Sequence, residues 1–99
     1  MAIRSPRWVV VAALVSLAPD TPGVYELWDG DELVYVGRTR DERTTLRGEL
    51  ERCLLDEHVS ATHFSWEISF HPVARERELL AEFERAHHRA PRLNSLLDA

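Results

Sequence analysis

Residues 22–40, PGVYELWDGDELVYVGRTR, restrict the possible folds more than any other stretch of this chain. Two short runs of apolar and aromatic residues flank the tripeptide DGD at 29–31. Aspartate and glycine suit a tight turn, because glycine adopts positive φ freely and aspartate tolerates it. The stretch therefore predicts a β-hairpin. Its first strand begins with GVY at 23–25, and its second ends with YVG at 35–37.

The sequence after the hairpin predicts two helices and a third strand. Apolar residues recur at helical spacing in 46–54, with Cys53 in the buried stripe as a small core residue rather than a nucleophile. Strict alternation in FSWEISF at 64–70 predicts a strand that ends before Pro72. Residues 73–89 predict a long helix that ends before Pro91, after which 93–97 fold back onto the sheet.

These patterns also predict which side chains face inward. In the third strand they are Phe64, Trp66, Ile68 and Phe70, and in the long helix they are Leu79, Leu80, Phe83, Ala86 and His87. The expected fold is a small α/β (α+β) domain: a three-stranded, mostly antiparallel sheet with helices packed against it. It is a single domain over 1–99, with its core at about 20–96.

Residues 1–18 allow two interpretations. Arg4 and Arg7 precede an apolar run, and SLA at 16–18 resembles a cleavage site, which is the outline of a secretory signal peptide. Pro19 is a poor neighbour for cleavage, and the favoured alternative is a retained N-terminal helix over 7–16. Its inward face would be Val9, Ala12, Ala13 and Ser16. The run is too short to cross a membrane as a helix.

Composition limits the function classes. A net charge of −5 argues against strong general binding to nucleic acid, because phosphate contacts need positive surface. All twelve basic residues are arginine, however, and five of them lie in 38–52. Arginine forks suit phosphate oxygens, so local binding is compatible with an acidic chain. A single cysteine is typical of a reducing compartment, and we expect a cytoplasmic protein.

The two hairpin tripeptides resemble the two halves of the GIY-YIG nuclease signature, in the same order and at hairpin spacing. The resemblance continues into EFERAHHRAPRLN, where Glu82 precedes Pro91 and Asn94. These positions look like the metal-binding glutamate on a helix and the Pro-x-x-Asn ending of that family, whose domains occur in excision-repair and homing endonucleases. The resemblance spans nearly the whole chain and implies the fold described above.

The resemblance implies a metal-dependent endonuclease that hydrolyses DNA phosphodiester bonds. Tyr25 matches the tyrosine that acts as general base, and Tyr35 matches the one that orients water and phosphate. Glu82 would bind Mg²⁺ or Mn²⁺. Arg38 matches a basic position that is common in the family and would contact phosphate, and Asn94 would hold the tail and the site together.

Further arginines, Arg40, Arg43 and Arg47, extend the expected substrate-binding surface beyond Arg38. The expected partner is DNA, with RNA not excluded, and a protein partner could supply specificity. No membrane association is expected.

The chain departs from the family at two positions of the helix over 46–54. Glu49 stands where the family has an arginine, and Cys53 stands where it has histidine or tyrosine; counting from Gly37 without a gap gives Thr45 instead. A glutamate at the arginine position would repel phosphate. An alternative function is therefore a catalytically impaired module of the same fold that binds nucleic acid or a protein partner. A third is a small regulatory or toxin-related protein that acts only through protein contacts.

Overall fold

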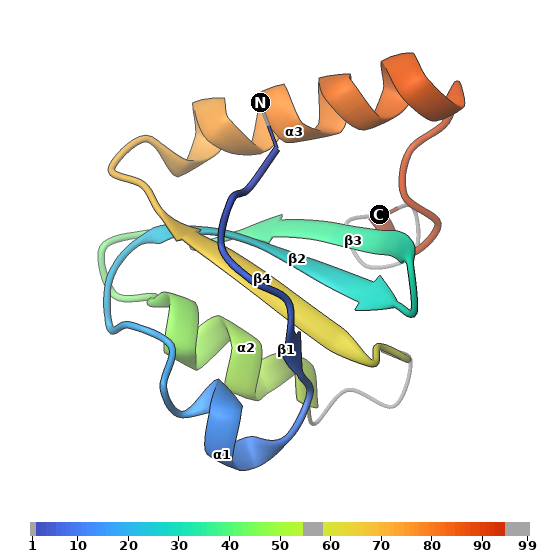
Figure 1. The fold of residues 1–99 in the computed structure, drawn as a ribbon. Helices are drawn as coiled ribbons and strands as arrows, with labels where there is room; N and C mark the ends of the chain where they lie inside the picture. The colour runs from blue at the N-terminus through green and yellow to red at the C-terminus, as the bar shows by residue number, and fades with distance from the viewer. Residues whose placement is uncertain (1, 55–58, 95–99) are drawn as a thin grey trace.

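The computed structural model describes residues 2–54 and 59–94. Within them, four strands form one antiparallel sheet in the order β1-β4-β2-β3, with three helices packed against it (Figure 1). In chain order the elements are β1 (Trp8–Val9), α1 (Ala12–Val15), β2 (Gly23–Asp29), β3 (Glu32–Arg38), α2 (Leu46–Leu54), β4 (His63–Ile68) and α3 (Pro72–His87). No helix in the described part of the chain has the length and apolarity needed to cross a membrane.

The predicted hairpin is confirmed. β2 and β3 pair antiparallel across Gly30, which adopts φ +60. Tyr25 lies opposite Gly37 and Leu27 lies opposite Tyr35, before the register shifts at Leu27/Trp28. Because β2 also pairs with β4, the first strand of the hairpin is the central strand of the sheet.

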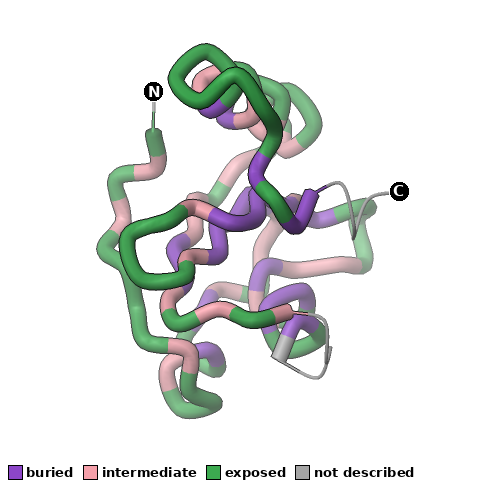
Figure 2. The backbone as a smooth tube through the Cα atoms, turned by 90° about the vertical axis from the view of Figure 1, so that its right-hand side faces the viewer, coloured by how far each residue is buried: buried purple, intermediate pink, exposed green. Residues whose placement is uncertain are grey.

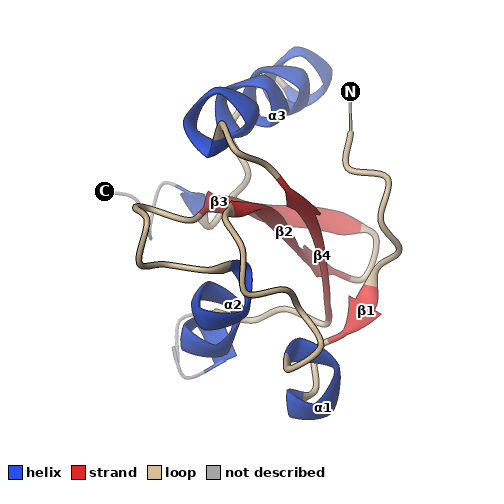
Figure 3. Cartoon of the chain, turned by 90° about the vertical axis from the view of Figure 1, so that its left-hand side faces the viewer, coloured by secondary structure: helices blue, strands red, loops and turns tan. Residues whose placement is uncertain are grey.

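The helices cover opposite faces of the sheet (Figure 3). α1 and α2 pack on the face that carries Tyr25, Tyr35 and Phe64, and this side holds the larger core. α3 packs on the other face, where Leu79 meets Val24 and Val36. Figure 2 shows that buried residues concentrate in the sheet and α2, whereas α3 is largely exposed. The two faces of β2 therefore point into two separate cores.

The N-terminal prediction was wrong in its secondary structure. Residues 8–9 form a fourth strand on β4, and the helix that follows covers only Ala12–Val15. Val9, Ala12, Ala13 and Ser16 are exposed, and the residues that reach the core are Val15 and Ala18. A two-residue strand forms only because β4 offers it a partner, and local periodicity does not contain that information.

Two inward faces also differ from prediction. In β4, Phe64 is buried and Trp66 is half-buried, but Ile68 and Phe70 are exposed because the strand ends at Ile68. In α3, Leu79 and Phe83 are buried and Leu80 is half-buried, whereas Ala86 and His87 are exposed. The ring of His87 stacks on Phe83 at 4.2 Å between centroids. Of the predicted returning tail, Leu93 and Asn94 are buried, and 95–97 lie outside the described residues.

Candidate functional site

The two glycines of the signature are required by packing. A Cβ on Gly37 would lie 2.4 Å from Cζ and 2.6 Å from the hydroxyl oxygen of Tyr25. A Cβ on Gly23 would lie 2.2 Å from the carbonyl oxygen of Glu67 and 2.7 Å from Leu46 Cδ1. Contacts below 3.0 Å are essentially never seen for real Cβ atoms. Gly37 thus leaves room for the Tyr25 ring, and Gly23 lets α2 approach the sheet.

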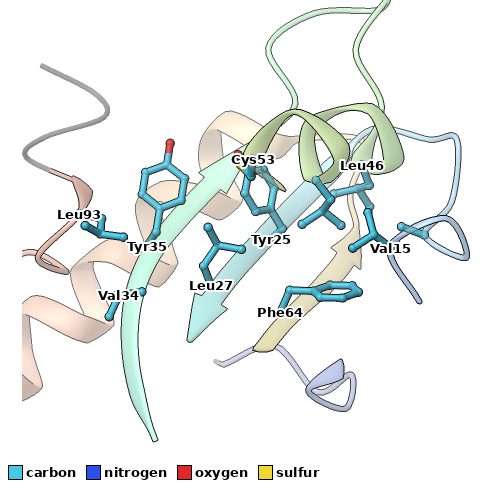
Figure 4. Close-up of a cluster of buried hydrophobic side chains, with 11 residues drawn as sticks. Val15, Tyr25, Leu27, Val34, Tyr35, Leu46, Cys53, Phe64 and Leu93 are labelled. Atoms are coloured by element: carbon cyan, nitrogen blue, oxygen red, sulfur yellow. Dashed lines mark hydrogen bonds between the residues drawn. The ribbon is translucent and has the colours of Figure 1, made fainter. Parts of the chain in front are cut away.

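Tyr25 and Tyr35 rise from neighbouring strands on the same face of the sheet (Figure 4). Their ring centroids are 6.0 Å apart and the rings are tilted by 46°. Shared placement on adjacent antiparallel strands is what the signature predicts. Both side chains are buried, however, because Tyr25 is 1 % exposed and Tyr35 is 2 % exposed, so the Tyr25 hydroxyl does not face solvent.

The hydroxyl of Tyr25 points at the inner face of α2. Its oxygen lies 3.5 Å from Glu49 Oε2, a long hydrogen-bond contact, and 3.7 Å from Cys53 Sγ. Burial is the main cause that raises the pKa of Tyr25 far above its ordinary value of 10.0, and Cys53, Tyr35 and Glu49 raise it further. A general base would need the opposite shift, which nearby positive charge produces.

Glu49 is itself fixed in place. It is buried, and its Oε2 accepts a hydrogen bond from Arg52 at 2.9 Å. That hydrogen bond raises the pKa of the Arg52 guanidinium. Glu49 and Cys53 are four residues apart on α2, so they lie on the same face one turn apart. The two residues that differ from the family pattern therefore both contact the Tyr25 hydroxyl.

Glu82 lies on the opposite side of the sheet. It projects from α3 beside a cavity whose sheet residues, Glu26, Trp28, Leu33 and Ser65, belong to the face away from α2. The carboxylates and hydroxyl around this cavity are oxygen donors of the type that Mg²⁺ prefers. A cation on Glu82 would, however, be separated by the sheet from Tyr25. In the described part of the chain, no three His, Cys, Asp or Glu side chains group in a way that could hold a metal ion.

The four predicted phosphate-binding arginines divide into two kinds. Arg38 and Arg40 line a groove of about 210 Å³ at the end of β3, where Arg38 also contacts Glu76 at 3.4 Å. Arg43 is exposed on the following loop. Arg47 instead donates from Nε to the carbonyl of Ala18 at 2.9 Å and pairs with Asp20, so it ties α2 to the preceding loop.

Asn94 caps the free edge of the sheet. Its Oδ1 accepts from the Val36 N–H at 3.0 Å, and its Nδ2 donates to the Val36 carbonyl at 2.9 Å. The backbone N–H of Leu93 donates to the Val34 carbonyl at 2.9 Å. The tail therefore pairs with β3 much as another strand would, and Asn94 has a clear structural role.

Sequence reasoning missed Glu26 and misplaced Phe70. Glu26 is a buried carboxyl group on the central strand, between Tyr25 and Leu27. A charged residue inside a strand that is apolar on both sides is the signal that could have identified it. Phe70 was assigned to the core, yet it is 77 % exposed beside Arg38 and Arg40.

Comparison with known proteins identifies the fold. No protein-family model matches the sequence, and no curated protein matches it. Solved structures do match, among them the GIY-YIG N-terminal endonuclease domain of UvrC from Thermotoga maritima bound to magnesium. That structure has a TM-score of 0.55 and 20% sequence identity, covering 83% of this chain and 92% of that chain.

Two point mutants of the same Thermotoga maritima domain match equally well. In each of them a tyrosine is replaced by phenylalanine and the catalytic divalent cation is bound. Both have a TM-score of 0.56, with 20% and 19% identity, and cover 83% of this chain and 91% of that chain. The resemblance drawn from the hairpin is thus confirmed at the level of the fold: this chain has the fold of a GIY-YIG nuclease domain.

Proposed function

We propose that this chain is a GIY-YIG-fold module that binds nucleic acid, DNA in the first instance, without hydrolysing it. The observation that carries the proposal is the position of the Tyr25 hydroxyl. It is buried under α2, against Glu49 and Cys53. The fold alone does not supply a reaction, because function depends on the side chains that occupy the site.

Hydrolysis of a phosphodiester bond needs a group that takes a proton from water, and that group must reach the water. The Tyr25 phenol is buried and its pKa is raised, chiefly by burial. Ionising it beside Glu49 would place two negative charges within 3.5 Å of each other. A phosphate approaching the same place would meet the Glu49 carboxylate and the guanidinium of Arg52, whose charge Glu49 already pairs. These features support binding without cleavage.

The surface best suited to binding is the groove at the end of β3. Arg38, Thr39, Arg40 and the exposed ring of Phe70 line it. Guanidinium groups contact phosphate, and an exposed aromatic ring stacks on an unpaired base. Asp41 and Glu42 line the same groove, so we expect weak, salt-dependent affinity for single-stranded DNA, in the range of about 10⁻⁴–10⁻⁶ M.

Fluorescence anisotropy with a labelled single-stranded oligonucleotide of about 12 nucleotides tests binding. Affinity should fall as salt rises, and Phe70→Ala should weaken it about tenfold, because stacking contributes about 1–3 kcal/mol per base. Leu17→Ala is the matched control, since Leu17 is 71 % exposed and does not line the groove. Binding that Phe70→Ala leaves unchanged would argue against this surface. A preference for RNA of the same length would change the proposed ligand.

The same samples test the absence of cleavage. Supercoiled and branched DNA would be incubated with the protein and Mg²⁺ or Mn²⁺, and nicking would be followed on a gel. The proposal predicts no metal-dependent nicking above a protein-free control. Nicking by the wild type that Tyr25→Phe removes would overturn it.

A second candidate function is the metal-dependent endonuclease on DNA. The retained signature residues Tyr25, Tyr35, Glu82 and Asn94 favour it, as does the fold shared with a nuclease domain that binds a catalytic divalent cation. When bound, the cation would supply charge that steadies the transition state. Under this candidate Glu82→Gln abolishes cleavage while barely changing stability. If wild type and Glu82→Gln cleave equally well, Glu82 is not the metal ligand.

A further inference from the structure

The face of the sheet away from Tyr25 contains a polar cavity of about 290 Å³. It lies between three strands of the sheet (β2, β3 and β4), the N-terminal segment and α3. Figure 1 shows the N-terminal segment running across the sheet towards α3. The polar or aromatic residues around the cavity are Ser5, Arg7, Glu26, Trp28, Ser65, Glu82 and Phe83. It shares no residue with the groove at the end of β3, so it is a separate feature of the fold.

Glu26 lies beside this cavity and is only 5 % exposed. The Ser65 hydroxyl donates to Glu26 Oε1 at 3.1 Å. Within the described residues, no ion pair to Glu26 is formed. Burial raises the pKa of Glu26, although the Ser65 hydrogen bond and the charges of Arg75 and Arg7 oppose the shift. A buried carboxylate is costly unless a cation compensates it, so this side chain is best satisfied by a positive charge in the cavity.

Trp28 gives the cavity an aromatic wall that already binds a cation. The Arg7 guanidinium lies 3.7 Å from the centroid of the Trp28 ring system. The indole Nε1–H donates to Ser65 Oγ at 3.3 Å, and this holds the ring in position. Arg7 also pairs with the fully exposed Asp31 at 3.5 Å, which places its guanidinium near solvent. A ring face with a cation at this distance is a favourable environment for guanidinium or ammonium groups.

We propose that this cavity binds a guanidinium or primary ammonium group of a small ligand or an extended peptide side chain. Glu26 is the counter-ion and Trp28 is the stacking surface. Arg7 is an internal competitor for Trp28, and it moves outward when the ligand enters. The inference is independent of nucleic-acid binding, because Glu26, Trp28 and Arg7 do not belong to the groove at the end of β3. The walls enclose too little volume for more than one side chain or a molecule of similar size.

Isothermal titration calorimetry of the full chain with agmatine, a small molecule that carries both a guanidinium and a primary ammonium group, tests the proposal. Wild type should bind, and Glu26→Gln should weaken binding about tenfold or more, because it removes the counter-ion. Arg7→Ala should strengthen binding several-fold, since it frees the face of Trp28. Arg77→Ala and Glu84→Gln are matched controls, because Arg77 and Glu84 are exposed and do not line the cavity. Both controls should bind as wild type does.

A parallel titration with the tripeptide N-acetyl-Gly-Arg-Gly-amide, whose blocked ends leave the arginine guanidinium as its one cationic group, separates the two sources of that group. Stronger binding of the tripeptide identifies a peptide side chain as the ligand, and stronger binding of agmatine identifies a free small cation. The proposal fails if neither probe gives saturable heat, or if Glu26→Gln binds as tightly as wild type. It also fails if Arg7→Ala weakens binding. Because Arg7 is exposed, this substitution should preserve the fold. Circular dichroism of each variant confirms that it is folded.

Discussion

Replacing Gly37 with alanine should strongly destabilise the protein. The new Cβ would lie 2.4 Å from Tyr25 Cζ and 2.7 Å from Tyr35 Cε2, whereas ordinary van der Waals contact begins at 3.4 Å. Restoring that contact requires the Tyr25 ring to move by 3.4 − 2.4 = 1.0 Å. The ring cannot move away from the sheet freely, because Glu49 and Cys53 of α2 contact its hydroxyl. Overpacking of this kind costs about 1–3 kcal/mol, and we expect the upper part of that range.

Urea denaturation followed by circular dichroism measures this loss, and thermal unfolding gives a second estimate. A loss of about 2–3 kcal/mol lowers the Tm of a domain of this size by about 10–20 °C. Gly48→Ala is the matched control, because its Cβ would meet only Thr45 Oγ1 at 3.4 Å, and alanine favours the helix by about 0.5–1 kcal/mol. A Gly37→Ala protein as stable as Gly48→Ala would refute the packing of Tyr25 on Gly37.

Three further substitutions test other parts of the structure. The pKa of Glu26 is raised in the folded protein. The free energy of unfolding of the wild type is therefore highest below the unfolded pKa of about 4.3, and it declines as the pH rises through the folded pKa. Glu26→Gln removes this ionisation, so it should stabilise the protein at about pH 7.5. Thermal unfolding should show that the difference disappears at about pH 3.5. Asn94→Ala should lower the free energy of unfolding, measured by urea denaturation, by about 2–3 kcal/mol, because the N–H and C=O of Val36 each lose a partner. A decrease of less than about 0.5 kcal/mol would exclude the edge-capping role. Glu49→Arg should raise DNA affinity in anisotropy measurements, since it replaces the carboxylate that pairs with Arg52 by a second cation. Unchanged affinity would show that DNA contacts the groove at the end of β3 without reaching α2.

The hairpin and α2 could be predicted because their signals are local. Turn residues at 29–31 and the spacing of Leu46, Leu50 and Cys53 fix these elements without knowledge of the rest of the chain. The strand at Trp8–Val9 could not be predicted, because it depends on pairing with Phe64 and His63, far along the sequence. The exposure of Phe70 follows from where β4 ends, which alternation alone does not determine.

The candidate site was predictable only in part, for a related physical reason. Sequence spacing correctly places Tyr25 and Tyr35 on one face of the hairpin. Helical periodicity identifies Leu79 and Phe83 as inward-facing residues of α3 but does not say which face of the sheet that helix covers. Glu82 therefore could not be placed relative to Tyr25 until the topology was known. By contrast, the substitutions at Glu49 and Cys53 were visible in sequence, and both residues contact the Tyr25 hydroxyl.

The central claim is that the Tyr25 phenol is buried and unable to act as a base, and its titration tests this directly. The chain has two tyrosines, so ¹³C labelling at tyrosine Cζ gives two NMR resonances, which Tyr35→Phe assigns. We predict that the Tyr25 resonance does not move as the pH is raised through 10, because burial, Cys53, Tyr35 and Glu49 all raise its pKa. A Tyr25 resonance that titrates below pH 10 would contradict the account, since it would reveal an accessible phenol activated by positive charge.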